Sequence, residues 1–236
     1  MMRGRWAFAA LALLGAVLLA GLGVWQVERR AWKLALIDRV ERRLAAPPVA
    51  PPPPSRWATI GADDAYTRLV VAGRWRPVPP VFAQAVTDAG AGFWVLSPLD
   101  TARGTILVNR GFVPRRDPAL MAEGPARVTG LLRVTEPGGG FLRNNDPAAD
   151  RWYSRDIDAI AAARRLGPVA PFFVDADAVP GNTGPRGGLT VVTFRNNHLV
   201  YAVTWFTLSA MMGFFAWRIA RAGGERRERD RGTGTS

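Results

Sequence analysis

The sequence contains no cysteine and only one histidine, His198. Without cysteine the chain can form no disulfide, no thiol nucleophile and no zinc-thiolate or copper-thiolate site. A Ser-His-Asp triad would have to use His198, which immediately precedes a long apolar run and does not stand in an ordinary soluble domain. The sequence therefore says little in favour of an enzyme, and we expect a protein without catalytic turnover.

Two long runs without a charged residue stand near the two ends of the chain. They are WAFAALALLGAVLLAGLGVW, from Trp6 to Trp25, and LVYAVTWFTLSAMMGFFAW, from Leu199 to Trp217. At about 1.5 Å per residue, a helix of roughly 20 residues spans the hydrocarbon core of a bilayer. The sequence therefore predicts transmembrane helices at residues 6–27 and 198–218.

The first run could instead be a cleaved secretory signal. Its basic start fits that reading, but its apolar part is longer than the roughly 7–15 residues of a signal core. No small-x-small cleavage site precedes the charged stretch VERR that begins at Val27. We therefore expect an uncleaved anchor.

The charges beside the two runs disagree about orientation. The tail at residues 219–236 is rich in arginine, which favours a cytoplasmic C-terminus, whereas the segment after the first run is more basic than residues 1–5. Two spans place both ends on one side, and a long domain crosses the membrane largely regardless of its charge. We follow the tail and expect both ends in the cytoplasm and the main domain in the periplasm, as in a two-span protein of the cell inner membrane.

The formal net charge of +12 raises the question of nucleic-acid binding. The arginines between the two runs are scattered and do not cluster on one expected element. Two membrane spans would also be unusual in a protein that recognises DNA. Attraction to anionic lipid headgroups, or to a ligand that carries carboxylates, accounts for the charge better. We expect the lipid bilayer, and no nucleic acid, among the partners.

The region between the runs begins with a helical stretch and a proline-rich stretch. Val27 to Leu44 keeps helical spacing, and Pro47 to Pro54 predicts a stiff extended spacer. Residues 28–55 are therefore expected to extend the first helix and then to link it to the domain.

Residues 56–197 are predicted to form an α+β domain dominated by antiparallel β-sheet. One short helix is expected from Asp156, a plausible N-cap, to Leu166, with Gly167 as its stop. Alternating or β-branched runs bounded by Gly, Pro and Asp predict strands. These strands are Thr67–Trp75, Val81–Val86, Gly92–Pro98, Thr105–Val113, Val128–Val134, Phe172–Asp175 and Leu189–Phe194.

Several phrases stand in a fixed order from about Leu22 to Trp217. Together with the two-span layout, they resemble the Surfeit locus family of cytochrome c oxidase assembly proteins. Phe112 stands where the family usually has Trp, and Val200 stands where Gln is common. The phrases are LGVWQ (22–26), FWVLSPL (93–99), LVNRGFVP (107–114), RWYSRDI (151–157) and NNHLVYAVTWF (196–206).

The resemblance implies an assembly factor for haem-copper (aa3-type) terminal oxidases. It implies that bacterial members bind haem a as cargo and help to insert it into the catalytic subunit of the oxidase, with His198 as the axial ligand of the haem iron. The catalytic subunit is then the expected partner, and the haem a synthesis machinery is a further candidate. A scaffold that steadies an assembly intermediate without binding haem, and a membrane-anchored enzyme of unknown reaction, remain as alternatives.

The residues around His198 can be judged without the resemblance. On a helix, Tyr201, Ala202 and Trp205 share its face, and the two aromatic side chains could pack against a porphyrin. Imidazole is a suitable axial ligand of haem iron, and Arg195 could meet a propionate. Spacing alone, however, favours an ordinary interfacial histidine, because aromatic residues gather at membrane interfaces in any case.

Trp25 and Gln26 end the first run at the level of His198. Trp25 taken alone is an interface anchor, whereas Gln26 could hydrogen-bond His198 and orient it. Two copies of the chain could supply two copies of His198, so a homo-oligomer is a further alternative. Small residues in both runs would let the two helices pack closely, namely Ala12, Ala16, Ala20, Ser209 and Gly213.

Overall fold

The computed structural model describes residues 2–140, 142–190 and 196–232, with side chains from residue 6 to residue 221. The chain divides into two compact units. One consists of residues 1–39 and 193–236, and the other of residues 40–192.

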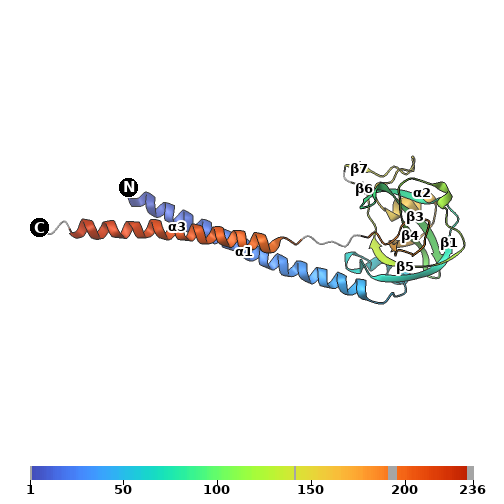
Figure 1. Ribbon diagram of the computed structural model, residues 1–236, viewed down its shortest axis with the longest axis horizontal. Helices are drawn as coiled ribbons and strands as arrows, with labels where there is room; N and C mark the ends of the chain where they lie inside the picture. Colours follow the sequence, from blue (N-terminus) through green and yellow to red (C-terminus); the bar gives the residue numbers. More distant parts are fainter. Residues whose placement is uncertain (1, 141, 191–195, 233–236) are drawn as a thin grey trace. The chain divides into compact units, whose positions relative to one another are not determined.

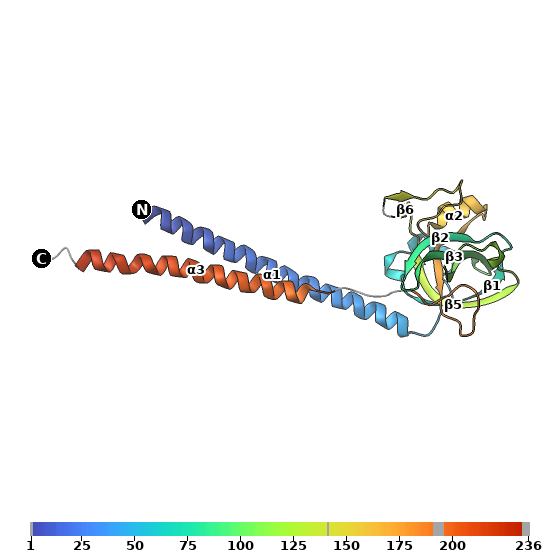
Figure 2. The ribbon, with the colours of Figure 1, turned by 45° about the horizontal axis from the view of Figure 1, so that its top comes forward.

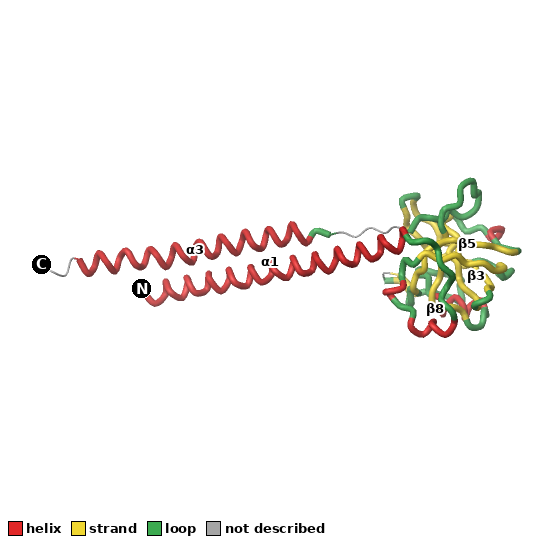
Figure 3. The backbone as a smooth tube through the Cα atoms, turned by 90° about the horizontal axis from the view of Figure 1, so that it is seen from below, coloured by secondary structure: helices red, strands yellow, loops and turns green. Residues whose placement is uncertain are grey.

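The first unit contains α1 (Met2–Ala45) up to residue 39 and α3 (His198–Gly232), and these two long helices lie side by side in each view (Figures 1, 2 and 3). Helix α1 is continuous from the apolar run through the basic extension and ends at Ala45, just before Pro47. That end is expected, because the residue before a proline avoids helical geometry. The helical spacing of residues 27–44 is therefore confirmed.

Small side chains bring the two helices together. Ala16 and Ala202 are buried, and the hydroxyl of Ser209 donates to the carbonyl oxygen of Ala16 at 2.7 Å. A Cβ atom added to Gly23 would lie 2.6 Å from the ring of Phe206. Ala16 and Ser209 therefore allow close packing, as their spacing predicted, whereas a Cβ atom added to Gly213 would meet nothing within 4 Å, so the prediction is wrong for this residue.

The outer surfaces of both helices are strongly apolar. The segments Trp6–Ala45 and His198–Arg221 are long and apolar enough to cross a membrane. Only 17% and 11% of their most apolar windows are buried. A core helix of a soluble protein would be mostly buried, so this protein leaves apolar helix surface for another environment to cover.

The second unit is built on a six-stranded sheet in the order β1-β5-β8-β4-β3-β2, in which β1 also pairs with β3. This additional pairing, at Gly73–Trp75 against Leu99–Thr101, joins β1, β5, β8, β4 and β3 into a closed ring. All pairings in the sheet are antiparallel except that of β4 with β8, which confirms the expected fold class. The bounds are β1 Arg68–Trp75, β2 Val81–Thr87, β3 Gly90–Thr101, β4 Gly104–Val113, β5 Pro125–Val134 and β8 Val169–Ala176.

Two hydrophobic clusters lie on opposite faces of this sheet. One takes alternate residues from all five strands of the ring, such as Leu69, Leu99 and Phe172. The other lies beneath helix α2 (Ile157–Arg164) and includes Trp152 and Phe173. Alternate residues of a strand face opposite sides, so β8 contributes Phe172 to one cluster and Phe173 to the other.

Short elements complete the domain. The expected helix is present, and the carboxylate of Asp156 caps it by accepting from the amide of Ala159 at 3.1 Å. It ends earlier than expected, at Arg164, because Arg165 and not Gly167 adopts the left-handed C-cap conformation. Val49 forms a parallel bridge with Leu69, so the proline-rich stretch runs beside β1. The remaining elements are β6 (Gly139–Gly140), β7 (Arg143–Asn144) and the 3-10 helices Pro54–Thr59, Ala62–Asp64 and Pro118–Leu120.

The strand expected at Leu189–Phe194 is the exception among the predicted strands. Leu189 and Thr190 adopt no strand, and residues 191–194 lie outside the described residues. The hydroxyl of Thr190 instead donates to Asp175 at 2.9 Å. A bond between two side chains does not show in the alternation of apolar residues, from which the strand was predicted.

Candidate functional site

The only histidine of the chain lies against the first helix. Helix α3 begins at His198, and Nδ1 of this residue lies 2.7 Å from Oε1 of Gln26 on α1. Gln26 is 9% exposed, which is unusual for a polar residue on an otherwise apolar helix. The hydrogen bond expected between these two residues is therefore present.

This contact fixes the chemistry of the imidazole. The amide oxygen of Gln26 can only accept, so the proton of the neutral ring belongs on Nδ1 of His198. The lone pair of the neutral ring then lies on Nε2, where it can bind a metal. A hydrogen bond on the opposite nitrogen is the usual way in which proteins orient a metal-binding histidine.

The other residues predicted for this site are arranged around the pair in different ways. Ala202 is 2% exposed, whereas Tyr201 and Trp25 are each 54% exposed and Trp205 is half-buried. Arg195 lies outside the described residues. The helices therefore bring Gln26 and His198 together and leave aromatic surface exposed beside them.

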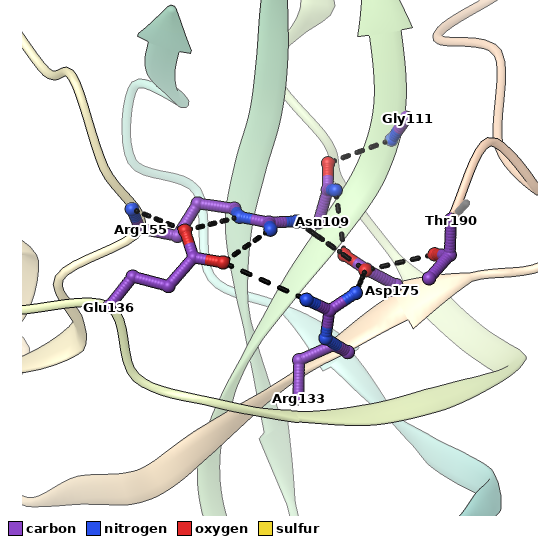
Figure 4. Close-up of polar contacts among 7 residues, drawn as sticks. All are labelled: Asn109, Gly111, Arg133, Glu136, Arg155, Asp175 and Thr190. Carbon is purple, nitrogen blue, oxygen red and sulfur yellow. Dashed lines mark hydrogen bonds and ion pairs between the residues drawn. The ribbon is translucent and has the colours of Figure 1, made fainter. Parts of the chain in front are cut away.

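A second group of polar side chains, which the sequence analysis did not find, lies in the β domain (Figure 4). At its centre is Asp175 on β8, which is 4% exposed. Its carboxylate accepts hydrogen bonds from Asn109 at 2.8 Å and Thr190 at 2.9 Å. It also accepts from Arg133 at 3.2 Å and Arg155 at 3.0 Å.

Arg155 connects this carboxylate to a second one. Its guanidinium donates to Glu136 through Nε at 3.0 Å and Nη2 at 2.5 Å, and it lies 4.7 Å from the ring centre of Phe173. Burial raises the pKa of Glu136, but hydrogen bonding and attraction by Arg155, together with attraction by Arg133, outweigh it and hold this pKa below its usual value. A lowered pKa is typical of an ion-paired carboxylate, whereas a general acid needs a raised one.

Every member of this group has a partner of opposite charge or a hydrogen-bond partner. The group joins segments far apart in the chain, from Asn109 on β4 to Arg155 before α2. A buried, fully partnered cluster of this kind fixes the packing of the segments that contribute to it. The signal for it in the sequence was the presence of Asn109 and Arg155 inside the phrases LVNRGFVP and RWYSRDI.

The described structure defines a class: a mostly antiparallel β domain between two helices long and apolar enough to cross a membrane. Residues 13–210 match the model of a family described as the SURF1 family. This match includes both Gln26 and His198. The chain belongs to the SURF1 family.

Named relatives cover most of the chain. Surfeit locus protein 1 of Homo sapiens is 39% identical over 221 residues, which are 82% of this chain and 71% of the human protein. The protein of the same name from Rattus norvegicus is 38% identical over 224 residues, 84% of this chain and 71% of the rat protein. That from Takifugu rubripes is 37% identical over 223 residues, 82% of this chain and 89% of the fish protein.

Proposed function

We propose that this protein is a membrane-bound assembly factor of haem-copper (aa3-type) cytochrome c oxidase. In this proposal it binds haem a as cargo through His198 and hands it to the catalytic subunit. The observation that carries the proposal is the hydrogen bond of 2.7 Å between Gln26 and Nδ1 of His198. Membership of the SURF1 family supports the role in oxidase assembly.

The proposed setting is a bilayer that both helices cross. Their exposed apolar surfaces would meet lipid, and the guanidinium of Arg29 lies 4.1 Å from the ring centre of Trp32, a pairing suited to the headgroup region. Gln26 lies one turn before Arg29, which supports a position for His198 near the border between lipid and water. The basic tail favours the cytoplasm for both ends and hence the periplasmic side for the β domain.

This position suits a haem. The porphyrin is apolar and its propionates are charged, so it lies best where hydrocarbon meets water. Its iron is already held by the ring and needs only axial ligands, one of which Nε2 of His198 can provide. Exposed Tyr201 and Trp25 and half-buried Trp205 offer aromatic surface for the ring. Arg195 is proposed to pair with a propionate.

The mode of binding also suits transfer. A single imidazole at an exposed helix surface holds the iron by one bond and does not enclose the ring. Cargo held in this way can leave when the receiving subunit offers a stronger site.

The test is to purify the full chain from cells that make haem a and to record its absorption spectrum. We expect the wild type to carry a haem a spectrum and His198→Ala to lose it. Thr204→Ala is the matched control, because the hydroxyl of Thr204 donates to the carbonyl oxygen of Val200 in the same helix. This variant should keep the haem.

Two outcomes would overturn the proposal in different ways. A haem spectrum that persists in His198→Ala would remove His198 as the ligand. A colourless wild type that still restores oxidase activity to cells lacking their own copy would favour a scaffold that does not bind haem.

A further inference from the structure

Strand β2 has an incompletely paired edge. Among the described strands of the six-stranded sheet, each of the others pairs with at least two strands, whereas β2 pairs with β3 alone. Its outer edge is covered only at Ala83, which forms a bridge with Trp152, and there the amide of Gln84 donates to the carbonyl oxygen of Trp152 at 2.8 Å. No described strand runs beside Ala85, Val86 and Thr87 on that edge.

The open part of this edge carries unprotected main-chain groups. Alternate residues of a strand direct their amide and carbonyl groups to the same edge, so those of Val86 point outward as the amide of Gln84 does. The side chain of Val86 is 88% exposed. Soluble proteins usually protect such an edge with lysine, proline or a bulge, and at Val86 a β-branched apolar residue stands instead.

A groove adjoins this edge. Its volume is about 510 Å³, and Gln84, Val86, Phe93, Arg143 and Tyr153 are among the residues that line it. Phe93 is the neighbour of Gln84 across the β2–β3 pair and packs edge-on against Phe82. The groove therefore offers apolar surface next to free main-chain groups.

Two arginines beside the groove are held in place without a carboxylate. The guanidinium of Arg143 lies 5.5 Å from the ring centre of Tyr153, and that of Arg116 lies 5.1 Å from the ring centre of Phe93. Among the described side chains neither forms an ion pair, whereas Arg133 and Arg155 in the same domain do. The positive charge at this groove is not neutralised within the described part of the domain.

We infer that the outer edge of β2 binds an extended acidic segment of a partner protein, which joins the sheet as an added strand. The main chain of the segment bonds to that of Val86, and its carboxylates pair with Arg143 and Arg116. Its apolar side chains enter the groove. Main-chain pairing with side-chain pockets is the general mode of strand addition. The inference concerns the β domain alone and does not depend on haem binding at His198.

The test uses the purified full chain in detergent and a dye-labelled seven-residue peptide in which pairs of valines alternate with pairs of glutamates, so that each face of the added strand carries both residue types. Fluorescence anisotropy measures its binding. We expect the glutamate peptide to bind and a peptide with lysine in place of glutamate not to bind. Arg143→Glu should abolish binding of the glutamate peptide.

The main-chain contribution is tested by Val86→Pro and its control Val86→Thr. Proline removes the outward amide without breaking the β2–β3 ladder, whereas threonine keeps the amide and a similar shape. Since a main-chain hydrogen bond contributes a factor of about three to ten, we expect binding about tenfold weaker for Val86→Pro and unchanged for Val86→Thr. Should Val86→Pro fail to fold, a peptide methylated on alternate backbone nitrogens gives the same comparison with the wild-type protein.

Three results would overturn the inference. One is the absence of binding by the glutamate peptide. A second is equal binding by the methylated and unmethylated peptides. The third is a protein that does not bind the peptide but binds vesicles of anionic phospholipid, with weaker vesicle binding by Arg143→Glu. That result would make this face a lipid-contact surface.

Discussion

The two polar sites of this protein differ in what they leave free. In the β domain, the carboxylate of Asp175 accepts bonds from Asn109, Thr190, Arg133 and Arg155. In the helical unit, the imidazole of His198 has one bond to a described side chain, that of Gln26, and the neutral ring keeps the lone pair of Nε2. The carboxylate of Asp175 is thus surrounded by donors, whereas Nε2 of His198 keeps a lone pair that can bind a ligand.

The difference separates a structural role for the Asp175 group from the binding role proposed for His198. Burying several charges is tolerable only when each one is paired, and the resulting network then fixes the packing of its segments. A histidine with one oriented nitrogen and one free nitrogen is instead ready to receive a ligand. Substitutions at the two sites should therefore change different properties, the first the stability of the fold and the second the binding of cargo.

The largest effect is expected for Asp175→Ala. It leaves the guanidinium of Arg155, which is 12% exposed, without half of its compensating charge. Removal of one partner of a buried ion pair typically destabilises a protein by about 3–5 kcal/mol. We expect a loss of this size in the free energy of unfolding of the β domain, measured by urea titration of the full chain.

Asp177→Ala is the matched control for that loss. Asp177 pairs with Arg68 at 2.5 Å, but both side chains are about a third exposed. An exposed ion pair contributes at most about 1 kcal/mol. Equal losses for the two variants would show that the Asp175 network is no more important to the fold than a surface pair.

The two sites also differ in how far the sequence reveals them. Gln26 and His198 could be paired in advance, because a bilayer fixes the depth of each residue on two crossing helices. The Asp175 network could not, because Asn109, Arg155 and Asp175 meet only through the pairing of β4 with β8 and the path of the chain into α2. Charged residues far apart in sequence leave no periodic pattern that would show which of them meet.

The same reasoning applies to the sheet. Local alternation located β1 to β5 and β8 to within a few residues, since a strand with one face buried shows its period directly. It did not reveal that β1 pairs with β3 and closes the ring, nor that β8 lies parallel to β4. Both pairings join segments that are distant in the sequence. They therefore depend on the packing of the whole domain and not on any one stretch.

The next effect is expected at the helical site. Gln26→Leu removes the acceptor that holds the proton on Nδ1 of His198. Loss of a partner behind a metal ligand typically weakens binding about tenfold to a hundredfold. We expect weaker retention of haem a, measured as the haem content per protein after dialysis, with no change in the unfolding of the β domain. An unchanged haem content would show that Gln26 does not orient the ligand.

A smaller effect is expected from pH. The pKa of Glu136 is lowered in the folded protein. The stability that it contributes is therefore fully present above its unfolded pKa and is lost as the pH falls through the lower, folded value. Because Glu136 is 36% exposed, solvent screening limits this contribution to about 1 kcal/mol. Glu136→Gln should lower stability at pH 7 and flatten its dependence on pH below the unfolded pKa of a glutamate. A slope equal to that of the wild type would place the acid sensitivity elsewhere.

The smallest effect is expected for Ser209→Ala, which tests whether polar contacts between the two helices hold the proposed haem site in place. The hydroxyl of Ser209 donates to Ala16 on the other helix, whereas that of Thr207 donates to Val203 in its own helix. Hydrogen bonds between membrane helices contribute only about 0.6 kcal/mol on average. Titration with dodecyl sulfate should therefore show a loss of this order in the stability of the helix pair for Ser209→Ala and a smaller one for Thr207→Ala.

Haem content should not change in either variant, because the imidazole of His198 is oriented by Gln26 and not by Ser209. Loss of haem in Ser209→Ala alone would show that close packing of the helices, as well as the bond from Gln26, positions the ligand.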